Sequence, residues 1–416
     1  MPVRALAYPE LTGAPVPGDQ VLLNTGALDL GLGTGGYALV VAIPDRLPPD
    51  PQGPGHLVKA RYTPLQATVL GADEQGSVHH RTLAEADSLD GIGVVIADLH
   101  SALPAVLAAF YSESFAAGRR VAPHPGQRSS APTTTHEAGH PRQTGTTGGA
   151  GTTGLARPAG PTGDVGDSGV TAPARLTDDV GTTGLTKPAG LTGDAGANGR
   201  PKVAYVMLDG GALPAWFSRT VSMLADCGWL AGTITVGQAF GGDLEAVTLH
   251  SGLLAARHVL GAELIVVAQG PGNLGTGTRW GFSGVASGEA VNAAAVLGGR
   301  PVASLRISEA DPRPRHRGIS HHSLTAYGRV ALARADVVVP DLPGEFGAEV
   351  AEAAKPLADR HNLVTVSVDG LREVLADCPV PLSTMGRNLD QDLAYFLAAA
   401  AAGRYAATLA PVPDRP

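Results

Sequence analysis

The sequence predicts an α/β protein, in which a Rossmann-like, doubly wound and mostly parallel sheet follows a small β-rich domain, either a barrel or a sandwich. After residue 88, apolar runs rich in β-branched residues alternate with helix-length segments. This alternation is typical of parallel strands that helices cover on both faces. Before residue 89, short β-type runs are separated by turns rich in Gly and Pro, and no segment has helical periodicity.

The β-rich domain is expected over residues 1–88, with apolar runs at 19–25, 37–44 and 56–73. A glycine-rich stretch, "LNTGALDLGLGTGGY", includes the end of the first run and leads into the second. Its glycines either line a ligand cleft or occupy turn positions where only glycine tolerates a positive φ. We favour the second interpretation, since glycine clusters commonly mark turns.

The α/β domain is expected to begin with one strand and helix at 89–120 and to resume at 201–416. Both parts carry the tetrapeptide "ALPA" after a strand, at 102–105 and 212–215, so the segment between them interrupts one domain. Seven strands are expected in the two parts, at 94–97, in the run from 202 onward, and at 233–236, 264–268, 301–307, 335–340 and 363–368.

The interrupting segment, residues 121–200, is rich in Gly, Pro, Thr and Asp and lacks Phe, Tyr and Trp between 121 and 199. It contains a duplicated unit, whose copies occupy 151–169 and 181–199. Such a composition buries too little apolar surface to offset the entropy that ordering costs. The sequence therefore predicts a disordered linker.

Composition restricts the class of function. The chain has 416 residues, and its net charge of -8 argues against binding to nucleic acid or to anionic membranes, which requires a basic surface. The first residues lack the apolar run of a signal peptide, and no apolar stretch is long enough to span a membrane. We therefore expect a cytoplasmic protein whose two cysteines are free thiols; a homo-oligomer is left open.

Ligands of such sheets bind at the carboxyl ends of the strands. Polar residues follow several predicted strands, among them Asp98, Asp209, Gln238 and Asp243. Two longer stretches follow the strands at 264–268 and 301–307, and both hold candidate site residues.

The first stretch is a glycine loop, "GPGNLGTGT", which matches G-x-G-x-x-G directly after a strand. A dinucleotide site is disfavoured because Pro271 removes a backbone donor, further glycines delay the helix, and no carboxylate ends the next strand. The alternatives are a backbone and hydroxyl cradle for an anion or a close turn against a neighbouring strand. The cradle would use Gly270, Gly272, Gly275, Thr276 and Thr278.

The second stretch, "EADPRPRHRGISHHSLT" at 309–325, combines histidines, arginines and carboxylates. If Ser320 caps the next helix, His321 and His322 lie in its first turn, whose free N–H groups attract anions. Adjacent residues on a helix project about 100° apart, so the two rings are not expected to share one face.

Three interpretations of this stretch remain open. In the first, Arg313, Arg315 and Arg317 hold a small anionic or phosphorylated metabolite, because guanidinium groups bind such anions bidentately. In the second, the stretch holds a metal ion, although nearby arginines oppose a dication. In the third, it is a surface loop that pairs with its own carboxylates. The candidate metal ligands are Asp311, His316 and His322.

Several long motifs also resemble an uncharacterised bacterial family, best known in actinobacteria and catalogued only as a domain of unknown function. They are "GDQVLLNTGALDLGLGTGGYALVVA", "VKARYTPLQ", "VGQAFGGDLEAVT", "GPGNLGTGTRWG" and "ADPRPRHRGISHHSLTA". The resemblance covers nearly all of the chain outside the predicted linker. It implies no reaction and no site residues.

Three functional hypotheses follow, and the sequence leaves open whether the protein is an enzyme and which cofactor it would use. The first is an enzyme or binding protein for a small anionic metabolite, with His316 or His321 as acid or base and Asp209 as a partner. The second is a metal-dependent hydrolase built from Asp and His ligands. The third is a non-catalytic regulatory or scaffold protein.

Overall fold

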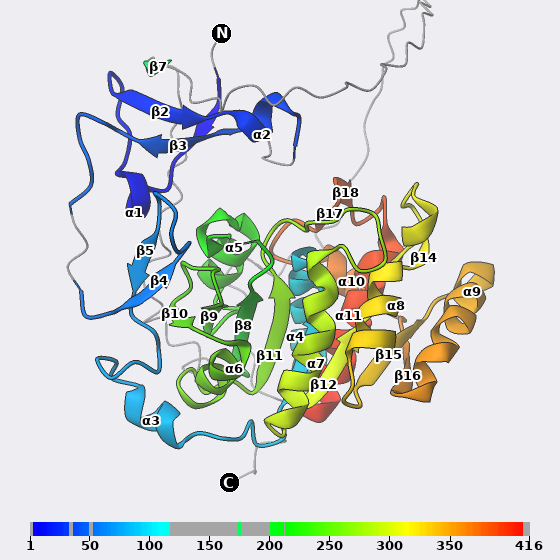
Figure 1. Cartoon of the computed structure of the whole chain (residues 1–416). Helices are drawn as coiled ribbons and strands as arrows, with labels where there is room; N and C mark the ends of the chain where they lie inside the picture. The colour runs from blue at the N-terminus through cyan, green and yellow to red at the C-terminus, as the bar shows by residue number, and fades with distance from the viewer. Residues whose placement is uncertain are drawn as a thin grey trace, which may run out of the picture. The chain divides into compact units, whose positions relative to one another are not determined.

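An eight-stranded, wholly parallel sheet forms the centre of the computed structural model (Figure 1), which describes residues 3–32, 36–49, 53–116, 174–175, 200–211 and 213–410. Its strands lie in the order β10-β9-β8-β11-β6-β12-β15-β16. They are β6 (Gly93–Ala97), β8 (Val203–Leu208), β9 (Gly232–Val236), β10 (Leu244–Ala246), β11 (Leu264–Gln269), β12 (Arg300–Ser304), β15 (Asp336–Asp341) and β16 (Asn362–Ser367). The predicted Rossmann-like α/β fold is confirmed.

Helices cover both faces of this sheet (Figure 1), which explains why its central strands are apolar throughout. On one face lie α6 (Leu249–His258) and α7 (Ala286–Val296); on the other lie α4 (Leu103–Ala116) and α11 (Leu393–Leu409). The last two pack closely, since a Cβ at Gly403 would lie 2.0 Å from the carbonyl oxygen of Val106. The remaining longer helices are α5 (Arg219–Asp226), α9 (Gly344–Ala354) and α10 (Leu371–Ala376). Among the helices that the structure describes, none combines the length and apolar character needed to cross a membrane.

The region before the α/β fold is β-rich, as predicted. Its strands form an open sheet, in the order β1-β3-β2-β7, and a separate hairpin of β4 and β5. The strands are β1 (Ala5–Leu6), β2 (Gln20–Asn24), β3 (Ala38–Ala42), β4 (Leu57–Lys59), β5 (Ala67–Val69) and β7 (Ala174–Arg175), with short helices α1 (Pro9–Thr12), α2 (Gly26–Asp29) and α3 (His80–Glu85). The strand β7 comes from the segment expected to be a disordered linker, most of which lies outside the described residues.

Two details of the α/β region differ from expectation. The eighth strand, β10, was not among the seven expected strands. It is followed by α6, which begins only at Leu249, where Thr248 caps the helix through a reciprocal pair of hydrogen bonds with Ser251. The run at 301–307 is also not one strand. After β12 ends, β13 (Ile307–Ser308) pairs antiparallel with β14 (Gly318–Ile319), and this small hairpin carries the Arg/His stretch.

A buried ion pair joins the β4–β5 hairpin to the edge of the large sheet. Lys59, fully buried, places Nζ 3.3 Å from Oε2 of Glu245 in β10, and it donates hydrogen bonds to the carbonyl oxygens of Ala239 and Ala246. Burial lowers the pKa of Lys59 and raises that of Glu245, because a low dielectric disfavours both charges. Each of the two buried charges is therefore stabilised by the opposite charge of its partner, which offsets the cost of burial.

Candidate metal centre

A buried charge pair marks the carboxyl edge of the two central strands. Asp98 directly follows β6, and Arg306 follows the neighbouring β12; the two residues are only 3% and 6% exposed. Nη1 of Arg306 donates to Oδ2 of Asp98 over 3.3 Å. Burial opposes the charged carboxylate, but the hydrogen bond from His322 and the charge of Arg306 hold the pKa of Asp98 below its ordinary value.

The β13–β14 hairpin folds the Arg/His stretch back over this edge. A positive φ at Gly318 turns the chain, and Ser320 then caps α8 (His321–Thr325) by accepting a hydrogen bond from the N–H of His322. The predicted cap at Ser320 is confirmed. This turn brings His316, at the end of a 3₁₀ turn, beside the first residues of α8.

Three histidines meet at this point. One ring nitrogen from each of His316, His321 and His322 lies within 4.8 Å of the others. The rings of His321 and His322 have centroids only 4.5 Å apart. The expectation that adjacent histidines in one helix cannot share a face is therefore wrong. The Cβ directions diverge, but rotation about the two side-chain torsions brings both rings to the same point.

Hydrogen bonds fix two of the three rings by one nitrogen each. Nδ1 of His322 lies 3.1 Å from Oδ2 of Asp98, and Nδ1 of His316 lies 2.8 Å from Oγ of Ser320. The buried Nε2 of His321 has no hydrogen-bond partner among the described residues. Phe282 stacks on His322 with ring centroids 3.8 Å apart. Histidines that bind metals typically have their second nitrogen fixed in this way.

The electrostatic environment keeps two of these histidines neutral. Burial, with the positive charges of Arg306 and Arg313, lowers the pKa of His316 to about 3. The pKa of His321 is also lowered, first by burial and then by the neighbouring His322 and Arg315. Neutral imidazole is the form that binds a metal ion, so neither His316 nor His321 has to release a proton near neutral pH.

Asp209 and Asp311, two predicted site residues, are not among the residues whose ligand atoms meet in this cluster. Asp209 follows β8, and the strand β11 lies between β8 and β6 in the sheet. The carboxylate of Asp209 accepts a hydrogen bond from the backbone N–H of Gln238. Asp311 is buried and forms a two-pronged ion pair with Arg313, with a further contact from Arg387 at 3.4 Å. The hydrogen bonds from Arg313, together with the charges of Arg313 and Arg387, hold the pKa of Asp311 well below its usual range. Asp311 thus stabilises the loop that carries His316.

The three predicted anion-binding arginines have separate surroundings. Arg313 is engaged by Asp311, and Arg317 lies 3.4 Å from Glu349. Arg315 is exposed and forms no ion pair with the described residues. Arg313 thus behaves as the surface-loop interpretation predicts, because it pairs with Asp311, a carboxylate of the same stretch. An anion held jointly by the three arginines stays a prediction.

The glycine loop after β11 folds into a hairpin of its own. Thr276 and Thr278 share a hydrogen bond of 3.2 Å, and both contact the backbone of Gly281. The next long helix, α7, begins only at Ala286, so no helix start follows the glycines directly as a dinucleotide site requires. Gly275 pairs with Phe282, which brings Phe282 back toward the histidines.

The first two glycines of the loop, Gly270 and Gly272, lie next to the end of the sheet. A Cβ at Gly270 would lie 3.2 Å from Sδ of Met207 on the neighbouring strand, which fits the close-turn interpretation. Gly270 and Gly272 also line a cavity of about 290 Å³ together with Asp98. Both glycines therefore lie at the carboxyl edge of the sheet, and an anion held by their backbone stays a prediction.

Sequence reasoning missed Arg306 and Phe282. Arg306 stood inside an apolar run and was taken as part of a strand. A charged residue within such a run is itself a signal, because burying it requires a partner. Phe282 carried no signal, since its place over His322 depends on how the glycine loop folds.

Fold and site together define a protein with three histidines at the carboxyl edge of a parallel α/β sheet. The chain belongs to the family described as "Protein of unknown function (DUF3866)", whose family model matches residues 4–123 and 189–403. The resemblance to an uncharacterised family is thereby confirmed, and the match omits residues 124–188, most of the predicted linker. Searches of curated proteins and of solved structures found no match.

Proposed function

We propose that His316, His321 and His322 bind a divalent transition-metal ion and that the protein is a metal-dependent hydrolase. The observation that carries this proposal is the convergence of three ring nitrogens within 4.8 Å. Imidazole suits zinc and neighbouring metals, and three protein ligands leave a fourth position for water, as in catalytic zinc sites.

Small adjustments would complete the coordination. Zinc to nitrogen bonds of about 2.0–2.1 Å in a tetrahedral site place ligand nitrogens about 3.3 Å apart. The histidine nitrogens, within 4.8 Å of one another, need to approach by roughly 1.5 Å at most. Ring rotation supplies this movement most easily at His321, whose Nε2 has no hydrogen bond to lose.

Among the surrounding charges, the carboxylate of Asp98 favours a metal ion at this point, against the arginines that lower the pKa values of His316 and His321. Asp98 contacts His322 directly and would strengthen it as a ligand, in the manner of carboxylate and histidine pairs beside zinc. The same carboxylate contacts Arg306, so the charge of that arginine is paired. The predicted metal set of Asp311, His316 and His322 is thus replaced by the three histidines, with Asp98 behind them.

We infer hydrolysis because three histidine ligands would leave the fourth coordination position of the metal ion open for water. A metal-bound water loses a proton near neutral pH and becomes a nucleophile, so the chain needs to supply only ligands and a place for the substrate. His321 borders a cavity of about 530 Å³, which provides that place.

The experiment is metal analysis of untagged protein, purified without chelators, incubated with zinc or manganese and then desalted. We expect about one metal ion per chain by mass spectrometry, and loss of that ion in His316→Ala and in His322→Ala. His250→Ala, an exposed histidine in α6, is the matched control and should retain the ion.

Wild-type protein without stoichiometric metal would contradict the proposal. So would a variant lacking all three histidines that binds as much metal as the His250→Ala control.

A further inference from the structure

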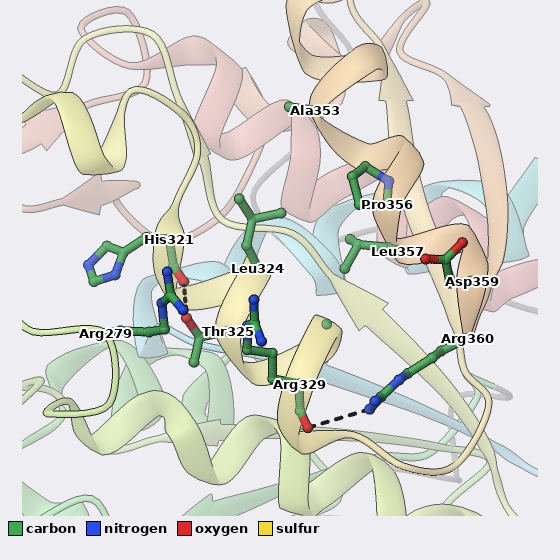
Figure 2. A pocket seen from close by; sticks show the side chains of 11 residues that line it. Arg279, His321, Leu324, Thr325, Arg329, Ala353, Pro356, Leu357, Asp359 and Arg360 are labelled. Atoms are coloured by element: carbon green, nitrogen blue, oxygen red, sulfur yellow. Dashed lines mark hydrogen bonds between the residues drawn. The ribbon is translucent and has the colours of Figure 1, made fainter.

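A cavity lined by arginines also includes His321, one of the three clustered histidines, in its lining (Figure 2). It has a volume of about 530 Å³ and contains three arginines but one carboxylate, in a chain whose net charge is -8. Cavities of this size accommodate small molecules. Its charged and titratable lining residues are Arg279, His321, Arg329, Asp359 and Arg360.

The arginines come from three separate segments. Arg279 lies in the glycine loop, Arg329 in the π-helical turn Ala326–Val330, and Arg360 just after a 3₁₀ turn that follows α9. Turns of π-helix often occur at functional sites. Chain segments this far apart bring three like charges together at an electrostatic cost, which a bound anion would offset.

Two of these guanidinium groups are available to a ligand. Arg279 and Arg329 form no ion pair with any residue that the structure describes. Arg360 is held in place, since its Nη1 contacts the carbonyl oxygens of Arg329 and Ala331 at 3.4 Å each (Figure 2). With Asp359 included, the arginines leave a net charge of about +2 in the cavity, which complements a dianion.

The glycine loop positions Arg279 at the cavity. Its threonine hydroxyls bond to each other and to the loop backbone, so they do not need to hold an anion themselves. Their hydrogen bonds shape the turn that carries Arg279.

His321 connects the cavity with the proposed metal centre. Its backbone oxygen accepts a hydrogen bond of 2.7 Å from Thr325, another cavity residue, while its ring points away from Leu357 in Figure 2. The ring lies 5.0 Å from that of His316, measured between centroids. His321 therefore belongs both to the lining of the cavity and to the histidine cluster.

We propose that this cavity binds the phosphate group of a small molecule and so defines the substrate class of the proposed hydrolase, on which this inference rests. The two available guanidinium groups, with the positive charge of Arg360 beside them, match the several oxygens and the double charge of phosphate, whereas a carboxylate offers two oxygens and one charge. The phosphate is held among the arginines, and the part of the substrate beyond it extends toward the histidines.

The test is calorimetric titration of full-length, zinc-loaded protein with inorganic phosphate. We expect saturable binding that weakens at least tenfold in Arg279→Gln and in Arg329→Gln, because each removes charge-assisted hydrogen bonds to the anion. Arg372→Gln, which alters an exposed arginine paired with Asp390, is the control and should bind phosphate normally. Metal content should stay at the wild-type value in all three variants, and melting temperatures confirm that each is folded.

The outcomes separate this inference from the proposed function. Absence of phosphate binding by zinc-loaded wild-type protein would overturn the inference, as would equal phosphate affinity in both cavity variants and the control. Tighter binding of malonate than of phosphate would refute the choice of anion. If the protein held no metal yet lost phosphate affinity in the arginine variants, the cavity assignment would stand and the hydrolase proposal would fail.

Discussion

Acid should destabilise the protein through one buried histidine outside the proposed site. His100 is 8% exposed, and its Nδ1 lies 2.9 Å from the hydroxyl of Tyr205. That hydroxyl donates to the carbonyl oxygen of Gln269, so it accepts from His100, whose Nε2 then accepts from Ser218 at 2.6 Å. The network fits a neutral ring, and burial lowers the pKa of His100 from 6.5 to about 4.

The sign and size of the effect follow from linkage. Between pH 6.5 and about 4 the unfolded chain binds a proton at this residue that the folded protein does not, so stability rises with pH across this window. The contribution of neutral His100 to the free energy of unfolding is fully present above pH 6.5 and is lost as the pH falls toward 4. One pKa unit corresponds to about 1.4 kcal/mol, so the full effect is about 3 kcal/mol, of which about 2 kcal/mol appears between pH 7 and pH 5.

Urea denaturation near pH 7 and near pH 5 measures this difference. His100→Gln removes the titrating group, so its free energy of unfolding should fall by about 2 kcal/mol less than that of the wild-type protein over this interval. His250→Gln, an exposed histidine, should behave like the wild type. An equal loss in His100→Gln and in the wild type would refute the reasoning.

Two further predictions concern the buried ion pair and the cap beside the histidines. Lys59→Met leaves Glu245 buried and unpaired, so chemical denaturation should show a loss of about 3–5 kcal/mol; a loss no larger than that of Arg372→Met, which breaks an exposed pair, would contradict this. Ser320→Ala removes a helix cap worth about 1 kcal/mol and also the hydrogen-bond partner of His316, so zinc affinity should fall about tenfold or more. Thr248→Ala removes the equivalent cap of α6 and should cost similar stability with unchanged zinc affinity; equal zinc affinities in the two variants would remove Ser320 from the site.

The sequence predicted the large sheet well because burial on both faces selects continuous apolar runs. Every expected strand is present in the parallel sheet, although the run at 301–307 ends early. The strand that was missed, β10, has three residues, lies at the edge and includes the buried Glu245. Its pairing with Lys59 links residues far apart in the chain, and no local pattern reports such a contact.

The sequence indicated the place of the proposed site, at the carboxyl edge of the sheet, but not the set of residues that the structure brings together there. The position of His321 and His322 in a capped first turn followed from Ser320, and both residues lie at the expected edge of the sheet. Their convergence with His316 depends on the β13–β14 hairpin, whose strands have two residues each, and on side-chain rotation; neither residue spacing nor helical geometry encodes these features. Asp311 looked like a metal ligand because the sequence does not show that Arg313 occupies both of its oxygens.

X-ray absorption at the zinc edge of loaded, full-length protein tests the central claim most directly. The proposed centre predicts a first shell of nitrogen and oxygen at about 2.0–2.1 Å, with the multiple scattering of three imidazole rings that diminishes when His321 is replaced by alanine. A sulfur shell at about 2.3 Å, from either of the free cysteines Cys227 and Cys378, would contradict the three-histidine site. So would a spectrum that is the same in the wild-type protein and in His321→Ala.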